Sequence, residues 1–80
     1  MAMPLGRATG FLIRLRRENK KYSREMCAEL CNLSERCVSN IERGVADPKF
    51  STVVKLCKTC DIDIKELYDT YLKELNIEDE

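Results

Sequence analysis

The spacing of apolar side chains along the chain predicts an all-helical protein. Apolar residues recur three or four positions apart, and the alternation that is typical of strands is nearly absent. This pattern predicts helices over about 8–19 and about 51–59, and three more that begin at Ser23, Ser34 and Asp63. Serine and aspartate favour a helix start because their side-chain oxygen accepts a hydrogen bond from a free N–H of the first turn.

The residues between these helices favour tight connections. Asn32 follows the second helix, where a left-handed backbone is expected, and asparagine is the usual occupant after glycine. Gly44 is expected to stop the third helix, and Val45–Pro48 is expected to form a loop, because proline biases the residue before it away from the helical region. Glu66, three residues after Asp63, is expected to complete a capping box at the start of the fifth helix.

No repeat, linker or composition break divides the chain. Its 80 residues suffice for one compact domain with a modest core. We expect a single domain over 1–80, with its core at about 8–69, a helical extension at 70–77 and an acidic, frayed end at 78–80. No apolar run approaches the ~18 residues of a membrane span, and no signal-peptide block follows the first residues, so we expect a cytoplasmic protein with no membrane partner.

The segment Ser23–Gly44 carries the functional signal. It is predicted as a helix, a turn of three or four residues, and a second helix, with Ala28 small enough to let the two helices cross closely. In such a corner the first helix lies over the DNA backbone, and the second enters the major groove with its N-terminal half toward the bases. The segment is therefore a candidate DNA-binding motif.

Over about Thr9–Tyr68 the sequence resembles the phage-repressor and Cro-like (Xre-type) helix-turn-helix family. The resemblance implies a compact five-helix, lambda-repressor-like fold. Each landmark is weak alone, but their order and spacing are specific. The landmarks are Gly10, Ile13-Arg14, Arg17, Ser23, Glu25, Ala28, Leu33-Ser34, Val38-Ser39, Ile41-Glu42, Gly44, Pro48, Leu56 and the segment Asp63–Tyr68.

The resemblance also implies which side chains contact DNA. The implied base-reading residues are Glu35, Arg36, Ser39 and Asn40. The implied phosphate-binding residues are Ser23, Arg24, Arg43 and Lys49. Arginine can bind guanine with two hydrogen bonds, asparagine can do so with adenine, and glutamate can accept from cytosine. The alternatives are that these residues form a solvated helix face, or that Glu35 pairs with Arg36 or Arg24 and contacts no base.

Three positions depart from the family pattern. Arg24 replaces the usual glutamine and keeps a donor while adding charge. Asn32 replaces the usual turn glycine, and Arg16 stands where the first helix is usually apolar. The resemblance further implies a partly buried ion pair between Arg17 and Glu42, which would join the first helix to the third and position the reading helix.

The charge distribution is compatible with DNA binding although the net charge is zero. Residues 1–60 contain twelve basic and six acidic side chains, whereas 61–80 contain two and eight. A basic body with an acidic tail can still present a positive face to phosphates. The alternative is ordinary surface charge with a solvated tail.

The five cysteines form an odd set, which does not fit a closed disulfide framework and favours a reducing compartment. Zinc would need four converging thiolates, and a redox role is the other alternative. Free cysteine can instead pack as a small hydrophobe. We expect the last of these, because the family has Leu, Val or Ala at the corresponding positions, which here are Cys27, Cys31, Cys57 and Cys60.

More apolar residues are present than one core needs. They are Phe11, Leu12, Leu15, Met26, Leu30, Tyr71, Leu72, Leu75 and Ile77. They either complete the monomer core or, on the fifth helix and its extension, form a two-fold dimer interface.

Together these observations predict a sequence-specific transcriptional regulator, a repressor that binds double-stranded operator DNA as a homodimer. The alternative is a protein-interaction module of the same fold, such as the antitoxin of a toxin–antitoxin pair. The chain has no histidine and no serine or cysteine beside a plausible base. We therefore expect no enzyme activity, no cofactor and no metal.

Overall fold

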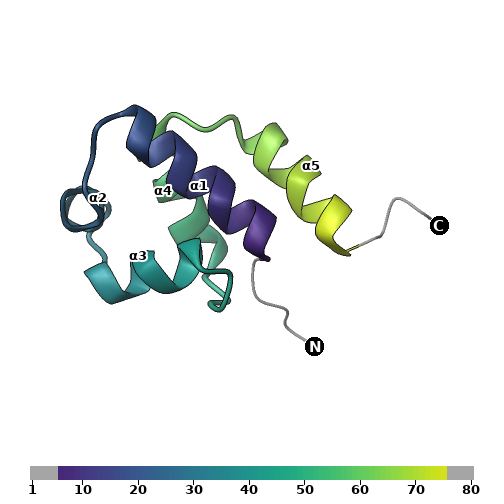
Figure 1. Cartoon of the computed structure of the whole chain (residues 1–80), viewed down its shortest axis with the longest axis horizontal. Helices are drawn as coiled ribbons and strands as arrows, with labels where there is room; N and C mark the ends of the chain where they lie inside the picture. Colours follow the sequence, from purple (N-terminus) through teal and green to yellow (C-terminus); the bar gives the residue numbers. More distant parts are fainter. Residues whose placement is uncertain (1–5, 76–80) are drawn as a thin grey trace.

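The computed structural model describes residues 6–75, which form five α-helices and no strand (Figure 1). α1 lies across α3 and α4, α2 and α3 meet at a sharp corner at one end, and α5 packs along α1 (Figure 1). The predicted all-α, five-helix class is therefore confirmed. The helices are α1 (Arg7–Asn19), α2 (Arg24–Cys31), α3 (Glu35–Glu42), α4 (Phe50–Cys60) and α5 (Ile64–Leu75).

The predicted local signals set the two helices of the corner. The Ser23 hydroxyl oxygen accepts a hydrogen bond from the Met26 N–H at 3.0 Å, and that of Ser34 accepts one from the Cys37 N–H at 3.0 Å. Asn32 adopts the left-handed conformation with φ 58°, which ends α2 and turns the chain into α3. The expected turn and caps are confirmed.

The capping box predicted at the start of α5 is wrong. Asp63 does cap the helix, because its Oδ1 accepts a hydrogen bond from the Lys65 N–H at 3.1 Å. The carboxylate of Glu66 instead accepts two hydrogen bonds from Arg16 Nη2, at 2.9 and 2.8 Å. A charge-assisted contact with a guanidinium is stronger than one with a neutral N–H, and it explains why α1 has an arginine where the family is usually apolar.

The core lies between α1 and the α2–α4 segment. Ile13, Val38, Ile41 and Leu56 are fully buried. Cysteines fill the gaps between these larger side chains, and the interpretation of Cys27, Cys31, Cys57 and Cys60 as core residues is confirmed. Burial raises the pKa of the Cys31 and Cys57 thiols. Within residues 6–75 no group of three or more cysteine, aspartate or glutamate side chains is arranged to hold a metal ion.

α5 is tied to the start of α1 by a carboxylate. Glu74 accepts hydrogen bonds from the N–H groups of Ala8 at 2.8 Å and Thr9 at 3.0 Å, and from the Thr9 hydroxyl. It therefore caps a helix from 65 residues away along the chain. Burial alone would raise the pKa of Glu74, but these hydrogen bonds outweigh burial and hold its pKa below the ordinary value of 4.5.

Because the folded pKa of Glu74 is depressed, its contribution to stability is present above pH 4.5 and is lost as pH falls through the folded value. We expect Glu74→Gln to lower the midpoint of urea unfolding at neutral pH and to reduce the loss of stability between about pH 5 and about pH 3. Asp69→Asn, on the exposed side of α5, is the matched control. Equal pH profiles for the Glu74→Gln and Asp69→Asn variants would contradict the capping role.

Within the described part of the chain, no helix is both long and apolar enough to cross a membrane.

Candidate DNA-binding surface

α3 separates its buried and exposed residues cleanly. Val38 and Ile41 are fully buried against the core, whereas Glu35 and Arg36 are exposed at the N-terminal end of the helix. The amphipathic pattern fixes this orientation, because burying the apolar stripe forces the polar stripe outward. The predicted reading helix therefore presents its polar face to solvent.

Six predicted DNA-contacting residues come together on this face. They line a shallow hollow of about 420 Å³ and are Arg24, Glu35, Arg36, Ser39, Asn40 and Arg43. Arg43 Nη1 donates a weak hydrogen bond of 3.4 Å to Asn40 Oδ1. No ion pair joins Glu35 to Arg24 or Arg36 in the described structure. The predicted intramolecular alternative for Glu35 is thus not formed, and its side chain is exposed beside the other predicted base-reading residues.

The remaining two predicted phosphate contacts are not among the residues that line this hollow. Ser23 is exposed beside it, next to Arg24 and Glu35 in a neighbouring depression. Its hydroxyl already accepts the cap hydrogen bond, and it remains free to donate. Lys49 is exposed at the N-cap of α4. Unpaired N–H groups at a helix start favour an anion, so Lys49 is chemically suited to a phosphate even though it does not line the α3 hollow.

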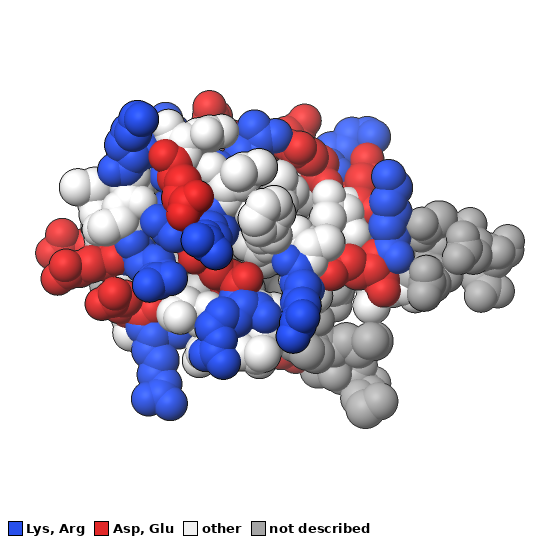
Figure 2. Space-filling model, in the orientation of Figure 1, with Lys and Arg blue, Asp and Glu red and all other residues white. Residues whose placement is uncertain are grey.

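The lower edge of the molecule in Figure 2, over α3, carries several projecting basic side chains. One further basic residue near the end of α3, Arg7, was not identified from the sequence. The start of α1 packs closely on Gly44, which follows α3. A Cβ added to Gly44 would lie 2.8 Å from the backbone nitrogen of Arg7. Arg7 therefore stands near the end of the reading helix. No sequence signal marks it, because 37 residues separate it from Gly44 and the tertiary packing alone brings them together.

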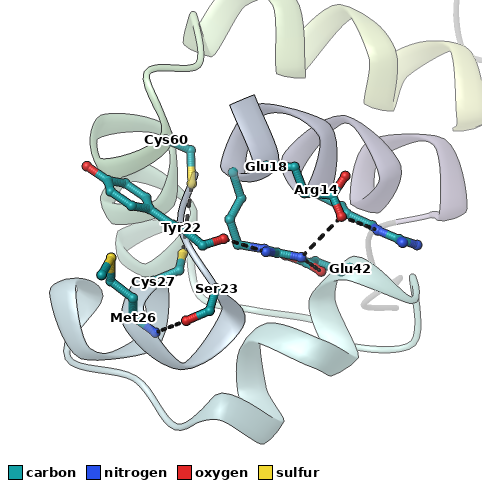
Figure 3. A network of polar contacts seen from close by, with 9 residues as sticks. Arg14, Glu18, Tyr22, Ser23, Met26, Cys27, Glu42 and Cys60 are labelled. Atoms are coloured by element: carbon teal, nitrogen blue, oxygen red, sulfur yellow. Dashed lines mark hydrogen bonds and ion pairs between the residues drawn. The ribbon is translucent and has the colours of Figure 1, made fainter. Parts of the chain in front are cut away.

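The structure brings Arg17 of α1 and Glu42 of α3 into a buried pair. Arg17 Nε donates to Glu42 Oε2 at 2.6 Å, and Arg17 Nη2 donates to Glu42 Oε1 at 3.1 Å. Arg17 Nη1 also donates to the Tyr22 carbonyl at 2.7 Å (Figure 3). The hydrogen bond with Glu42 raises the pKa of Arg17, although burial opposes this. A backbone acceptor such as Tyr22 leaves no signal in the sequence.

This network connects three elements. Figure 3 shows it between α1, the α1–α2 connection and the end of α3, with the exposed Arg14–Glu18 pair at its edge. A bidentate guanidinium–carboxylate contact fixes direction as well as distance. The network is therefore suited to holding the C-terminal end of the reading helix at a fixed angle to α1.

A short helix, a tight turn and a second helix with an exposed polar face define the class of helix-turn-helix DNA-binding proteins. The sequence profile of the helix-turn-helix family matches residues 13–67. The chain belongs to the Xre/Cro-like branch of this family, a class of DNA-binding transcriptional regulators rather than of enzymes. Among curated protein sequences, none matches the chain.

Three solved structures illustrate the similarity. The restriction-modification controller protein C.AhdI from Aeromonas hydrophila is 31% identical with a TM-score of 0.71, over 76% of this chain and 92% of that one. The hypothetical transcription factor NHTF from Neisseria is 25% identical with a TM-score of 0.74, over 94% and 89% of the two chains. The clp gene regulator ClgR from Corynebacterium glutamicum is 19% identical with a TM-score of 0.76, over 91% and 94%, and supports the fold alone.

Proposed function

We propose that the protein is a sequence-specific transcriptional repressor that binds a two-fold operator as a homodimer in the cytoplasm. The observation that carries this proposal is the exposed face of α3, where Arg36, Asn40 and Glu35 line one hollow without internal ion pairs. These three types of side chain can distinguish guanine, adenine and cytosine in the major groove. A surface that served only for solvation would have no need of this combination.

In the proposed complex the two groups of residues act differently. Glu35, Arg36, Ser39 and Asn40 contact base edges, and Ser23, Arg24, Arg43 and Lys49 contact phosphates on either side. Phosphate contacts set the register of the protein, whereas base contacts select the sequence. Arg7, beside the end of α3, is a further candidate for a phosphate contact.

Selection from random duplex DNA, followed by titration at several salt concentrations, tests the proposal directly. We expect an enriched motif with related halves about 34 Å apart, since each copy would read one half-site. Binding without any enriched motif, together with a steep salt dependence alone, would show non-specific association instead. A reporter placed under the selected site should fall on expression of the protein, and a rise would show activation.

Arg36→Ala should relax specificity at one base pair. A lost bidentate contact with guanine would reduce discrimination there by about 1–3 kcal/mol while leaving the other positions unchanged. The measurement is competition between the selected site and single-base variants. Arg24→Ala is the matched control, because loss of a phosphate contact should weaken all sequences alike. A uniform loss for Arg36→Ala would assign it to a phosphate.

An apolar surface supports the proposed dimer. Phe50 is 73% exposed and Tyr68 is 59% exposed, and they border a hollow of about 360 Å³ together with Ile64. Tyr71 lines the same hollow and also packs against the core, so part of the surplus apolar residues completes the monomer. One such module covers only about 600–1,000 Å² on DNA, a small footprint for a specific site. Pairing two copies through this apolar surface would double the area that the protein covers on DNA.

We expect Tyr68→Glu to weaken self-association by at least about tenfold, because it places a charge in the centre of the proposed interface. The measurement is sedimentation equilibrium, with binding to full and half operators as a second readout. Phe11→Glu is the control, since Phe11 is also an exposed aromatic residue but lies on α1. A wild-type protein that is monomeric at high concentration and binds a single half-site would rule out the dimer.

A further inference from the structure

A second hollow lies away from the reading helix. It has a volume of about 470 Å³ and runs between α2 and α4, and we name it the α2–α4 hollow. Its lining residues are Tyr22, Leu30, Cys31, Asn32, Lys55, Lys58 and Thr59. None of these belongs to the predicted DNA-contacting set, so DNA binding leaves the hollow unexplained.

The α2–α4 hollow combines an exposed apolar side with a cationic side. Leu30 is 57% exposed, and Met26, one turn earlier on α2, is 46% exposed. Lys55 and Lys58 line the hollow from α4, and neither forms an ion pair within residues 6–75. Figure 2 shows uncharged atoms at the left edge of the molecule, with both basic and acidic side chains close by. The surface therefore suits a segment with an apolar side chain and several carboxylates.

The chain itself contains a segment of this kind. Residues 76–80 read Asn-Ile-Glu-Asp-Glu, with one large apolar side chain followed by three carboxylates. They directly follow α5. We propose that residues 76–80 of a second copy of the chain dock into the α2–α4 hollow, with Ile77 against Leu30 and the carboxylates against Lys55 and Lys58.

The length of the molecule favours a second copy, rather than the same copy, as the source of the docked segment. Five residues span at most about 18 Å when fully extended, and the longest dimension of the molecule is 39 Å. α2 and the end of α5 lie at opposite ends of that dimension (Figure 1). The proposed contact is therefore between two molecules, and it joins the α2–α4 hollow of one copy to residues 76–80 of the other. Such a head-to-tail contact closes into a ring or extends as an open chain, and in either case assembly increases with protein concentration.

This contact is separate from the two-fold dimer proposed above. The dimer surface is centred on Phe50, Ile64 and Tyr68, whereas the α2–α4 hollow is lined by the C-terminal halves of α2 and α4. The two contacts can form at the same time, and one can fail without the other. Both can therefore be tested in the same 80-residue chain.

The test is a charge exchange followed by sedimentation velocity at increasing protein concentration. We expect Lys55→Glu/Lys58→Glu to weaken assembly beyond the dimer by at least about tenfold, and Glu78→Lys/Glu80→Lys to do the same. Combining all four substitutions reverses both partners and should restore assembly. Raising the salt from about 50 mM to about 300 mM should weaken the wild-type contact, because exposed charges are screened.

Lys65→Glu/Lys73→Glu, on the exposed side of α5, is the matched control for the change of net charge. Thermal unfolding of each variant verifies that the fold is retained. Repeating the series in the Tyr68→Glu background separates this contact from the two-fold dimer, since the head-to-tail contact should persist there. Assembly that is equal in all variants, or a loss that the fourfold exchange does not restore, would overturn the proposal.

Discussion

Replacing Arg17 by alanine is expected to lower the free energy of unfolding by about 3–5 kcal/mol. The side chain of its partner, Glu42, is only 4% exposed, so the substitution leaves a buried carboxylate without its counter-charge. It also leaves the Tyr22 carbonyl without its donor. For a domain of this size a loss of that order removes a large share of the total stability. Urea unfolding followed by circular dichroism measures the effect.

A double-mutant cycle separates the coupling free energy between Arg17 and Glu42 from the cost of leaving one buried charge unpaired. We expect the double variant Arg17→Met/Glu42→Met to be destabilised by much less than the sum of the single variants, because two apolar side chains can pack where the ions stood. The exposed Lys65–Asp69 pair of α5 is the control, and its coupling should be at most about 0.5 kcal/mol. Additive effects at Arg17 and Glu42 would contradict the positioning role.

Gly10→Ala is expected to destabilise the protein by about 1–3 kcal/mol. A Cβ at this position would lie 2.5 Å from the Glu42 carbonyl oxygen and 2.6 Å from that of Ile41, so α1 or the end of α3 must move. The direction is informative, because glycine-to-alanine changes inside helices usually stabilise by up to about 1 kcal/mol. Thermal or urea unfolding gives the sign.

Asn19→Ala, at the exposed end of α1, is a suitable control for helix propensity. Stabilisation of both variants would show that the helices do not touch as closely as described. If Gly10→Ala pushes α3 away from α1, the folded variant should also bind the selected operator more weakly. Binding titrations below the unfolding temperature distinguish this effect from loss of folded protein.

The sequence alone determined the helices and the exposed polar face of α3, because the signals for these features are local. The caps at Ser23 and Ser34 and the turn at Asn32 each depend on residues within four positions. The stripe that buries Val38 and Ile41 also dictates which side of α3 is exposed. The order of family landmarks then supplied the function class.

Only the tertiary structure decided which distant residues meet. Glu66 pairs with Arg16 across 50 positions instead of capping its own helix, and Glu74 caps α1 across 65. The α2–α4 hollow likewise brings Leu30 into one site with Lys55 and Lys58. Local sequence determines helical propensity, but the choice among charged partners depends on which helices pack together and at what angle. That choice is made by burying the common apolar core, so it could be seen only once the helices were in place.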